Sequence, residues 1–363
     1  MSSMIQARPR AVSTSPAERR TKLADLRFGT AFTEHMVSMR WSVRDGWHDG
    51  ELVPYGNVTL PPTAVGLHYG QIVFEGLKAF RLEDGRVASF RAAQHARRFA
   101  ASARRLMMPE MPEELFVAAI RDLVRQDQDW LGDDPGISLY LRPILFATEE
   151  TLALRPATEY RFLLTAFITE GYFGRSLEPV TVWLCEDYVR AAPGGTGAAK
   201  CAGNYAAGLI AQEQAAANGC DQVVWLDAAT RTLVEEMGGM NLWFVVRDGD
   251  SHRLLTPPLT GSILPGVTRD ALLTVAPRLG LPVTEAPVSV EQWRTGCLSG
   301  EITEVFACGT AARVSPVAEV RGADGSWSCG TGDRPVTARL SRHLFGIQRG
   351  VIPDEDGWLD VIS

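Results

Sequence analysis

A lysine in a glycine- and alanine-rich loop is the residue of this chain best suited to chemistry. Lys200 closes the run Arg190-Ala-Ala-Pro-Gly-Gly-Thr-Gly-Ala-Ala-Lys200, and Tyr205 follows five residues later. Its immediate neighbours offer no charge and no bulky side chain. Two interpretations are open at this point. Lys200 is either an ordinary solvated loop lysine, or an amine in a cramped, poorly solvated site where desolvation favours the neutral form that attacks a carbonyl.

Two familiar motifs that combine glycines with a lysine do not fit this run. A phosphate-binding P-loop needs Gly directly before the lysine and Ser or Thr directly after it, but Ala199 and Cys201 stand there. A dinucleotide fingerprint needs a third glycine at the position of Lys200, and no suitably spaced acidic residue marks a ribose site. The sequence therefore excludes both nucleotide-binding motifs around Lys200.

Two segments of the second half could hold an anionic group such as a phosphate. In the run Ile263-Leu-Pro-Gly266-Val267-Thr268, a tight turn at Gly266 would present the amides of Val267 and Thr268 at the start of a helix, where the helix dipole favours an anion. The simpler alternative is that Thr268 only caps the helix. The run Cys308-Gly309-Thr310-Ala311 offers a second hydroxyl and amide set, which alone is only a turn.

A carboxylate and a phenol complete a set of groups that one cofactor would need. Glu236 precedes the pair Gly238-Gly239 and a hydrophobic run, so its charge requires a buried cationic partner unless it is an ordinary strand-end acid. Such a carboxylate could face a protonated ring nitrogen. Tyr205 could bond a phenolate, although a tyrosine that opens a helix is more often a half-buried core residue. An aldehyde for Lys200, a phosphate, a ring nitrogen and a phenolate together describe pyridoxal 5'-phosphate.

Ordered motifs along most of the chain give a family resemblance. The sequence resembles the branched-chain amino acid aminotransferases, which are fold-type IV pyridoxal-phosphate enzymes, from about residue 28 to the C-terminal helix. The motifs that carry this resemblance are Leu67-His-Tyr-Gly70, Phe74-Glu-Gly-Leu-Lys-Ala-Phe80, Leu139-Tyr-Leu-Arg-Pro143, Lys200-Cys-Ala-Gly-Asn-Tyr205, Glu236-Met-Gly-Gly-Met-Asn241, Leu264-Pro-Gly-Val-Thr-Arg269 and Gly309-Thr-Ala311.

The resemblance implies a role for each matching cofactor residue. Lys200 would form the Schiff base with the cofactor and, once displaced by substrate, would move a proton between the substrate and the cofactor. Glu236 would keep the pyridine nitrogen protonated, so that the ring accepts electrons, and Tyr205 would bond the phenolic oxygen. The residues implied for the phosphate are Arg98, Val267, Thr268 and Thr310.

The resemblance also implies a reaction and a substrate site. The enzyme would transfer an amino group reversibly between leucine, isoleucine or valine and 2-oxoglutarate. The residues implied for the substrate are Phe74, Tyr140, Arg142, Tyr172 in the interdomain loop, Ala311, and Tyr69 from the partner subunit of a homodimer. Alternatives within the fold are a D-amino acid aminotransferase or an aminodeoxychorismate lyase. A non-enzymatic phosphate-binding module would use residues 266–268 and Arg98, but it leaves Lys200 and Glu236 without a role.

Two departures from the mammalian members of this family limit the transfer. Gly239 stands where those enzymes have a threonine, and Ala312 and Ser315 stand at the positions of their redox-sensitive cysteine pair. We therefore expect no thiol switch of that kind. The forms of the motifs around Lys200 and Glu236 are more similar to those of bacterial enzymes.

Bulk composition agrees with a soluble enzyme of small molecules. The 363 residues are 45% hydrophobic and 22% charged, and the net charge of -7 is spread without long runs, which argues against nucleic-acid binding. No apolar stretch is long enough to cross a bilayer. The six cysteines and six histidines show no metal-ligand or disulfide spacing, so we expect no metal and a reducing, cytoplasmic location.

The elements that must position these residues predict two domains. We expect a small α+β domain over residues 28–170, a linker over 171–179 and a larger cofactor-binding domain over 180–363, giving an α+β or α/β fold of the D-amino acid aminotransferase type. Residues 1–27 are expected to be a disordered tail, with a transit peptide as the alternative because arginines outnumber acids there. The expected helices are 91–107, 112–127, 205–217, one after Pro265-Gly266, and 335–348; the expected strands are 139–143, 165–168, 180–184, 222–226, 233–235 and 241–247.

Overall fold

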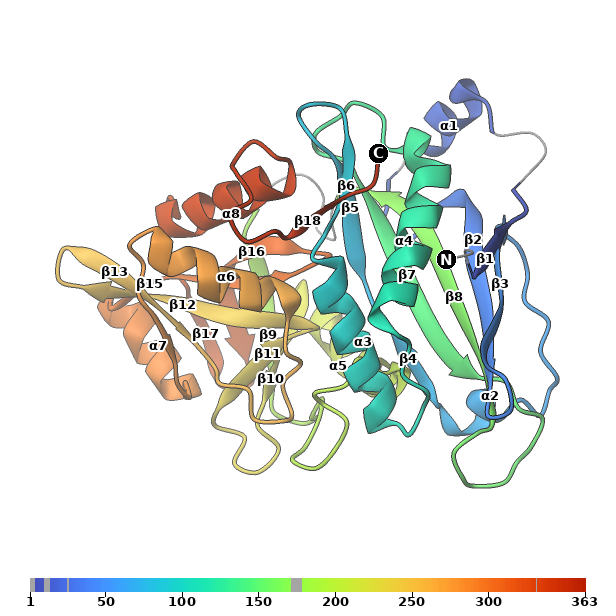
Figure 1. Cartoon of the computed structure of the whole chain (residues 1–363). Helices are drawn as coiled ribbons and strands as arrows, with labels where there is room; N and C mark the ends of the chain where they lie inside the picture. The colour runs from blue at the N-terminus through green and yellow to red at the C-terminus, as the bar shows by residue number, and fades with distance from the viewer. Residues whose placement is uncertain (1–3, 10–13, 25, 171–177, 331) are drawn as a thin grey trace. The chain divides into compact units, whose positions relative to one another are not determined.

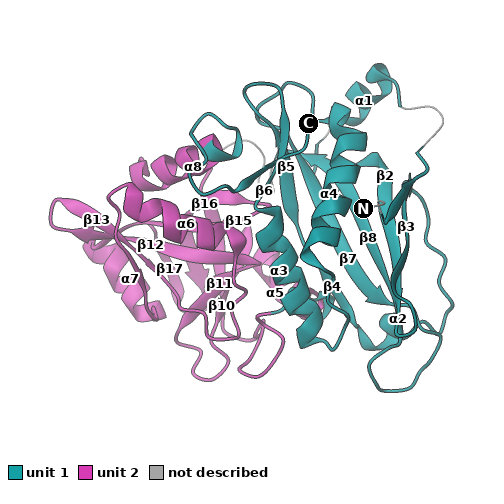
Figure 2. Cartoon of the chain, viewed as in Figure 1, with its two compact units in different colours: residues 1–175, 199–203, 347–363 teal, residues 176–198, 204–346 magenta. Residues whose placement is uncertain are grey.

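The structure of the protein is a computed structural model that describes residues 4–9, 14–24, 26–170, 178–330 and 332–363. The chain forms two compact units, shown in Figure 2: unit 1 comprises residues 1–175, 199–203 and 347–363, and unit 2 comprises residues 176–198 and 204–346. This division differs from the expected one in two segments. Residues 199–203, which include Lys200, and the C-terminal residues 347–363 belong to unit 1. The expected linker falls largely outside the described residues.

Unit 1 is built on one sheet of mainly antiparallel strands (Figure 1). The strand order is β1-β3-β2-β8-β7-β5-β6-β18, with β4 also paired to β7. Long strands β7 and β8 pair over their whole length, from Ser138 opposite Thr169 to Ala147 opposite Tyr160. The strands are β1 (Ile5–Ala7), β2 (Ala31–Ser42), β3 (Gly46–Pro54), β4 (Ile72–Phe74), β5 (Leu77–Arg81), β6 (Val87–Phe90), β7 (Ser138–Ala147), β8 (Glu159–Thr169) and β18 (Leu359–Val361).

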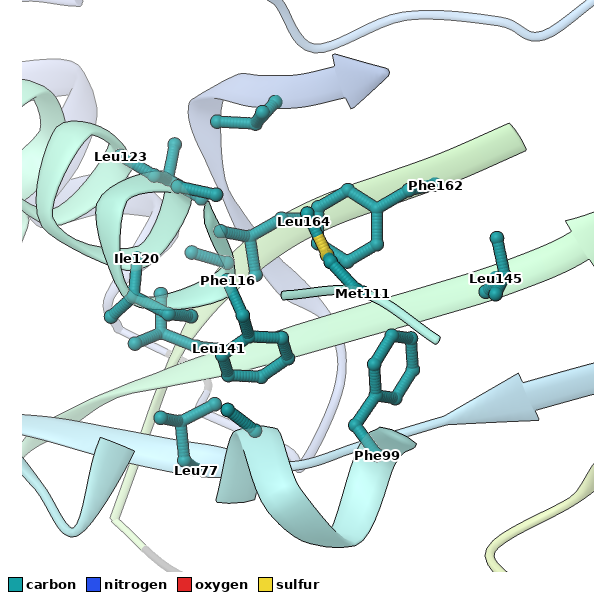
Figure 3. Packing of buried hydrophobic residues seen from close by; sticks show 14 of the residues in the cluster. Leu77, Phe99, Met111, Phe116, Ile120, Leu123, Leu141, Leu145, Phe162 and Leu164 are labelled. Atoms are coloured by element: carbon teal, nitrogen blue, oxygen red, sulfur yellow. The ribbon is translucent and has the colours of Figure 1, made fainter. Parts of the chain in front are cut away.

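Helices α3 (Ala92–Arg105) and α4 (Glu113–Asp127) pack on one face of this sheet (Figure 1). Both are amphipathic, so each buries one apolar stripe. Phe99, Phe116 and Phe162 meet with ring centres 5.5 to 6.4 Å apart, and Figure 3 shows them within a cluster of leucines and isoleucine. Each such buried side chain contributes about 1.5–3 kcal/mol of hydrophobic stabilisation. The core thus holds α3, which carries Arg98, rigidly on the sheet.

The remaining helical segments of unit 1 are short. They are α1 (Pro16–Lys22), α2 (Val65–Tyr69) and the 3-10 turn at Gln128–Trp130. Pro112 was expected in the first turn of its helix, but it is the N-cap residue of α4. Proline suits either position, because its fixed φ is compatible with both and neither position requires a backbone N–H donor.

The N-terminal residues correct one expectation. Where residues 1–27 were expected to be disordered, strand β1 pairs in parallel with β3 and α1 forms with a capping box between Ser15 and Glu18. The backbone N–H of Thr14 also donates to the buried carboxylate of Glu34 at 2.9 Å. Sequence reasoning missed this segment because its order depends on pairing with distant residues more than on its own hydrophobic periodicity.

Unit 2 contains a mixed sheet whose strand pairing closes on itself. The order is β11-β10-β9-β16-β15-β12-β13-β14, with β17 beside β16, and β11 pairs again with β12. The strands from β11 to β12 in this order therefore form a closed barrel. They are β9 (Val180–Cys185), β10 (Gln222–Leu226), β11 (Val234–Met237), β12 (Met240–Asp248), β13 (Ser251–Thr256), β14 (Val283–Glu285), β15 (Ile302–Gly309), β16 (Arg313–Gly322) and β17 (Gly325–Ser328).

Unit 2 contains the three helices that the sequence predicted and one, over residues 290–299, that it did not predict. They are α5 (Ala202–Ala217), which begins in unit 1, α6 (Val267–Arg278), α7 (Val290–Ser299) and α8 (Pro335–Gln348), which ends in unit 1. Helix α5 begins three residues before the expected start at Tyr205, whereas α8 has the expected bounds. Large aromatic residues fill the core of the unit, for example Trp243 stacked on Phe306 with ring centres 5.9 Å apart. Among the described residues, no helix has the length and apolarity needed to cross a membrane.

Candidate active site

Lys200 lies in unit 1, where its backbone is fixed from both sides. Its N–H donates to the hydroxyl of Ser102 at 2.9 Å, and its carbonyl accepts from the N–H of Phe74 at 3.0 Å. The amine nitrogen lies 4.9 Å from the centre of the Phe74 ring. The lysine is therefore no freely solvated loop residue. Its loop ends in a defined position, half-buried and directly against an aromatic face.

Three of the residues expected to bind substrate gather beside Lys200 in unit 1. The guanidinium carbon of Arg142 lies 5.0 Å from the centre of the Phe74 ring and 5.5 Å from that of Tyr140. Tyr140 in turn stacks on Phe167 with ring centres 4.8 Å apart. Strand β7 places Tyr140 and Arg142 two residues apart and hence on one face of the sheet. The aromatic rings of Phe74 and Tyr140 therefore form an apolar surface with the cationic side chain of Arg142 over it.

Arg98, expected to hold the cofactor phosphate, is bound to a residue that sequence reasoning left without a role. Its Nε donates to the Glu75 carboxylate at 2.8 Å, and its Nη2 donates to the other oxygen of the same group. Burial raises the pKa of Glu75, but the charge of Arg98, followed by His95, outweighs burial and holds this pKa well below its usual range. Glu75 lies within the motif that carries the family resemblance, but only the fold reveals its partner, which is distant in sequence.

Glu236, in unit 2, is a buried carboxylate with three donors around it. It is 1% exposed; it forms an ion pair with Arg190, whose Nε lies 2.7 Å away, and it accepts from the N–H of Leu264 at 2.9 Å and from the Asn241 amide at 3.3 Å. The buried cationic partner expected for Glu236 is thus Arg190, at the start of the glycine-rich run. A charged partner and amide donors favour the ionised form of a carboxylate, which is the form that could face a protonated ring nitrogen.

The turn at Gly238-Gly239 lies against two further predicted site segments of unit 2. A Cβ atom added to Gly239 would lie 3.5 Å from the hydroxyl of Tyr205, and one added to Gly309 would lie 3.3 Å from the Met240 side chain. Asn241 also pairs in the sheet opposite Cys308. Tyr205 and the Thr310-Ala311 turn therefore both adjoin the hairpin that carries Glu236.

Helix α6 of unit 2 begins where the sequence predicted a helix N-terminus. Gly266 is the N-cap residue, and no described side chain caps the helix, so the alternative that Thr268 is only a cap is wrong. A Cβ at Gly266 would lie 2.0 Å from Asn241 Oδ1. The Asn241 amide donates to the Leu264 carbonyl at 3.1 Å as well as to Glu236. Asn241 thus ties the helix start to the buried carboxylate, and an anion at Val267 and Thr268 would benefit from the helix dipole.

The remaining predicted substrate residues are Tyr172 and Tyr69. Tyr172 lies outside the described residues. Tyr69 is 48% exposed, and its hydroxyl donates to the Leu152 carbonyl at 2.9 Å within the same chain. At the position of the mammalian cysteine pair, the hydroxyl of Ser315 donates to the Ala312 carbonyl at 2.9 Å, which is an ordinary turn contact.

Comparisons with known proteins agree on one family. The amino-transferase class IV family matches residues 72–320. The chain is 51% identical over 352 residues to the branched-chain-amino-acid aminotransferase of Mycolicibacterium smegmatis, covering 96% of each chain. It is 50% identical over 361 residues to the probable branched-chain-amino-acid aminotransferase of Streptomyces coelicolor, covering 99% of each.

Solved structures give the same result for the fold. The branched-chain amino acid aminotransferase of Escherichia coli superposes with a TM-score of 0.75 at 30% identity, covering 91% of this chain and 99% of that chain. That of Thermobaculum terrenum in its PLP form has a TM-score of 0.68 at 25% identity, with 90% and 98% covered.

The chain belongs to the amino-transferase class IV family. Within that family it belongs with the branched-chain aminotransferases of fold-type IV. These relatives favour that group over a D-amino acid aminotransferase or an aminodeoxychorismate lyase, and they exclude a phosphate-binding module without enzymatic activity.

Proposed function

We propose that this protein is a pyridoxal-phosphate-dependent branched-chain-amino-acid transaminase. It transfers an amino group reversibly between leucine, isoleucine or valine and 2-oxoglutarate. The observation that carries this proposal is Lys200 itself: the predicted reactive lysine ends its loop with both backbone groups bonded and its amine against Phe74. The identity of about half of all residues to the mycobacterial enzyme over nearly the whole chain supports the substrate class.

The polar groups of both units have the chemistry that the cofactor requires. When bound, pyridoxal 5'-phosphate supplies an aldehyde for a lysine and a ring that withdraws electrons from the substrate carbon. Lys200 would be the amine for that aldehyde, and Glu236, a buried carboxylate paired with Arg190, would face the ring nitrogen. The hydroxyl of Tyr205 would bond the phenolic oxygen. Arg98, Val267, Thr268 and Thr310 would hold the phosphate.

Each residue performs one task in the reaction. With the cofactor bound, the Lys200 amine would accept the proton from the substrate α-carbon and return it to the cofactor carbon; its backbone hydrogen bonds to Ser102 and Phe74 hold the residue in place. Glu236 would keep the ring nitrogen of the cofactor protonated, and its contacts with Arg190, Leu264 and Asn241 orient the carboxylate and favour its ionised form.

The substrate residues account for two unlike side chains. The faces of Phe74 and Tyr140 accept the aliphatic side chain of leucine, isoleucine or valine. Arg142, whose guanidinium lies over both rings, binds the side-chain carboxylate of glutamate or 2-oxoglutarate. The turn at Thr310-Ala311 and Tyr172 complete the substrate contacts on this proposal.

The active form is proposed to be a cytoplasmic homodimer in which Tyr69 contacts the partner's substrate. Support comes from the exposed apolar side chains around α2 and the segment to which Tyr69 is bonded. Leu67 is 61% exposed, Leu152 51% and Leu154 86%. Apolar side chains exposed together in this way are typical of interfaces.

Purified protein incubated with L-leucine, 2-oxoglutarate and pyridoxal 5'-phosphate tests this function. We expect glutamate and the 2-oxo acid of leucine to form in equal amounts. The variant Lys200→Ala should abolish turnover yet keep part of the cofactor affinity, since the phosphate contacts remain. No glutamate from the wild-type protein, or normal rates in Lys200→Ala, would refute the proposal.

A further inference from the structure

Glu75 is a charged residue to which the proposed function gives no task. It follows strand β4 in the short connection to β5, and its side chain is completely buried. A carboxylate without partners in such a place would be strongly unfavourable, because its charge loses the stabilisation of water. The partners of Glu75 therefore indicate why the residue is there.

Those partners hold the carboxylate in one orientation. Oε2 accepts from Arg98 Nε at 2.8 Å, while Oε1 accepts from Arg98 Nη2 and from the N–H of Gly76 at 2.8 Å. His95 Nδ1 lies 3.3 Å from Oε1. Both oxygens thus face the guanidinium side by side, in the planar two-bond geometry that fixes an arginine most firmly.

The same helix that carries Arg98 also holds Lys200. Ser102 lies one turn after Arg98 in α3; its hydroxyl donates to the Arg98 carbonyl at 2.9 Å and accepts from the N–H of Lys200 at 2.9 Å. Phe74, the residue before Glu75, donates its N–H to the Lys200 carbonyl at 3.0 Å. The contacts form a closed ring from Glu75 through Arg98, Ser102, Lys200 and Phe74 back to Glu75, all within unit 1.

We propose that Glu75 is a positioning residue for the cofactor site. It fixes the guanidinium of Arg98 in the orientation that binds the cofactor phosphate, and it holds α3 where Ser102 can fix Lys200. A guanidinium has enough N–H donors to bind Glu75 and a phosphate oxygen together. This inference rests on the proposed function, because it assumes that Arg98 binds the phosphate.

The binding of two ligands to the apoprotein separates this role from a merely structural one. Pyridoxal 5'-phosphate and pyridoxal differ only in the phosphate, so the ratio of their affinities reports the phosphate contacts. In Glu75→Gln the side chain keeps its size and an oxygen for the Gly76 N–H, but it loses the charge that orients Arg98. We expect the affinity for pyridoxal 5'-phosphate to fall about tenfold to a hundredfold, as for loss of one charge-assisted hydrogen bond, with the pyridoxal affinity within about threefold of wild type.

The neighbouring residue of α3 supplies a matched control. Arg97 pairs with Glu113 at 2.8 Å on the exposed side of the helix, with side chains 64% and 37% exposed. Glu113, at the start of α4, is outside the ring of contacts. Glu113→Gln removes the ion pair of Arg97 in α3 and should change the affinity for neither ligand. If Glu75→Gln does not fold, Glu75→Asp retains the charge but withdraws it from Arg98, and the same selective loss is expected.

Two results would overturn the inference. Unchanged affinity for pyridoxal 5'-phosphate in a folded Glu75 variant would show that Arg98 needs no positioning. Equal loss of both ligands would show that Glu75 serves only the stability of unit 1. Failure of the proposed function looks different, since the wild-type protein itself would then bind neither ligand.

Discussion

At the scale of single residues, the reactive groups are defined by their partners more than by their own type. The backbone of Lys200 forms hydrogen bonds with Ser102 and Phe74, and the carboxylate of Glu236 forms an ion pair with Arg190. In both cases the sequence shows the reactive residue in a distinctive glycine-rich setting. The partners, by contrast, are ordinary residue types at distant positions, and sequence alone offers no signal that joins them.

The role of Glu236 can be tested against its neighbour in the same strand. Glu236→Gln should lower kcat by about 10²- to 10³-fold, the usual effect of removing one preorganised electrostatic contact, while cofactor affinity falls less than about tenfold. Glu235→Gln is the control, because this neighbouring carboxylate has a different partner, the hydroxyl of Ser262, from which it accepts a hydrogen bond. Steady-state kinetics and cofactor titration measure both effects. Equal losses of kcat and affinity in Glu236→Gln would instead point to a structural acid.

At the scale of elements, short turns and helix ends set the geometry of the site. The sequence predicted α6 and α8 well because Gly266 and Pro335 mark their starts. It did not predict β1, whose order depends on parallel pairing with β3. Nor could it place Lys200 in the first unit, because the strand bridge between Val73 and Cys201 joins residues far apart in the chain. The sequence thus predicts helix starts that depend on local residues, but it does not predict strand pairs between distant residues.

The connection from β4 to β5 has a strict steric requirement at Gly76. A Cβ there would lie 1.9 Å from the hydroxyl of Tyr140, whose ring is held by Phe167 and by Phe28 at 5.1 Å. Gly76→Ala should therefore displace Tyr140 and raise the KM for leucine about tenfold, the effect expected of a moderately disturbed apolar pocket. Gly56→Ala, where the added Cβ meets only the Pro54 carbonyl at 3.9 Å, is the control. An unchanged KM for leucine in Gly76→Ala would contradict the proposal that Tyr140 contacts the substrate.

The ion pair between Glu75, in the connection from β4 to β5, and Arg98 of α3 should stabilise the fold less at acid pH. The folded protein holds the pKa of Glu75 below its ordinary value of 4.5, so the ion pair contributes stability fully above that pH and loses it progressively as the pH falls further. Between the two pKa values the unfolded chain binds more protons. Urea unfolding from pH 7 to pH 3 should thus show a steeper decline below about 4.5 for wild type than for Glu75→Gln. Parallel curves would contradict a Glu75 that is ionised in the fold.

At the scale of the whole molecule, the chain combines a mainly antiparallel sheet with helices on one face and a closed mixed barrel. The fold-type IV fold expected from the sequence agrees with the solved relatives. Residues that sequence reasoning grouped around one cofactor occur in both units, with Lys200 and Arg98 in the first and Glu236 and the start of α6 in the second.

The proposed homodimer gives a prediction for the native mass. One chain has a mass of 39.6 kDa, so native mass spectrometry should find about twice that value. Leu154→Asp, which places a charge among the exposed apolar side chains near Tyr69, should shift the protein toward the single-chain mass. A wild-type protein with the mass of one chain at micromolar concentration would count against a partner contribution from Tyr69.

The composition of the chain allows a simple test of whether Lys200 carries the cofactor. The chain has only three lysines, Lys22, Lys78 and Lys200. Lys78 is buried, and Lys22 lies over the Trp130 ring. Reduction of the cofactor-loaded protein with sodium borohydride, followed by peptide mass mapping, should place the pyridoxyl phosphate group on Lys200 alone. A group on Lys22 or Lys78, or on no lysine, would contradict the account.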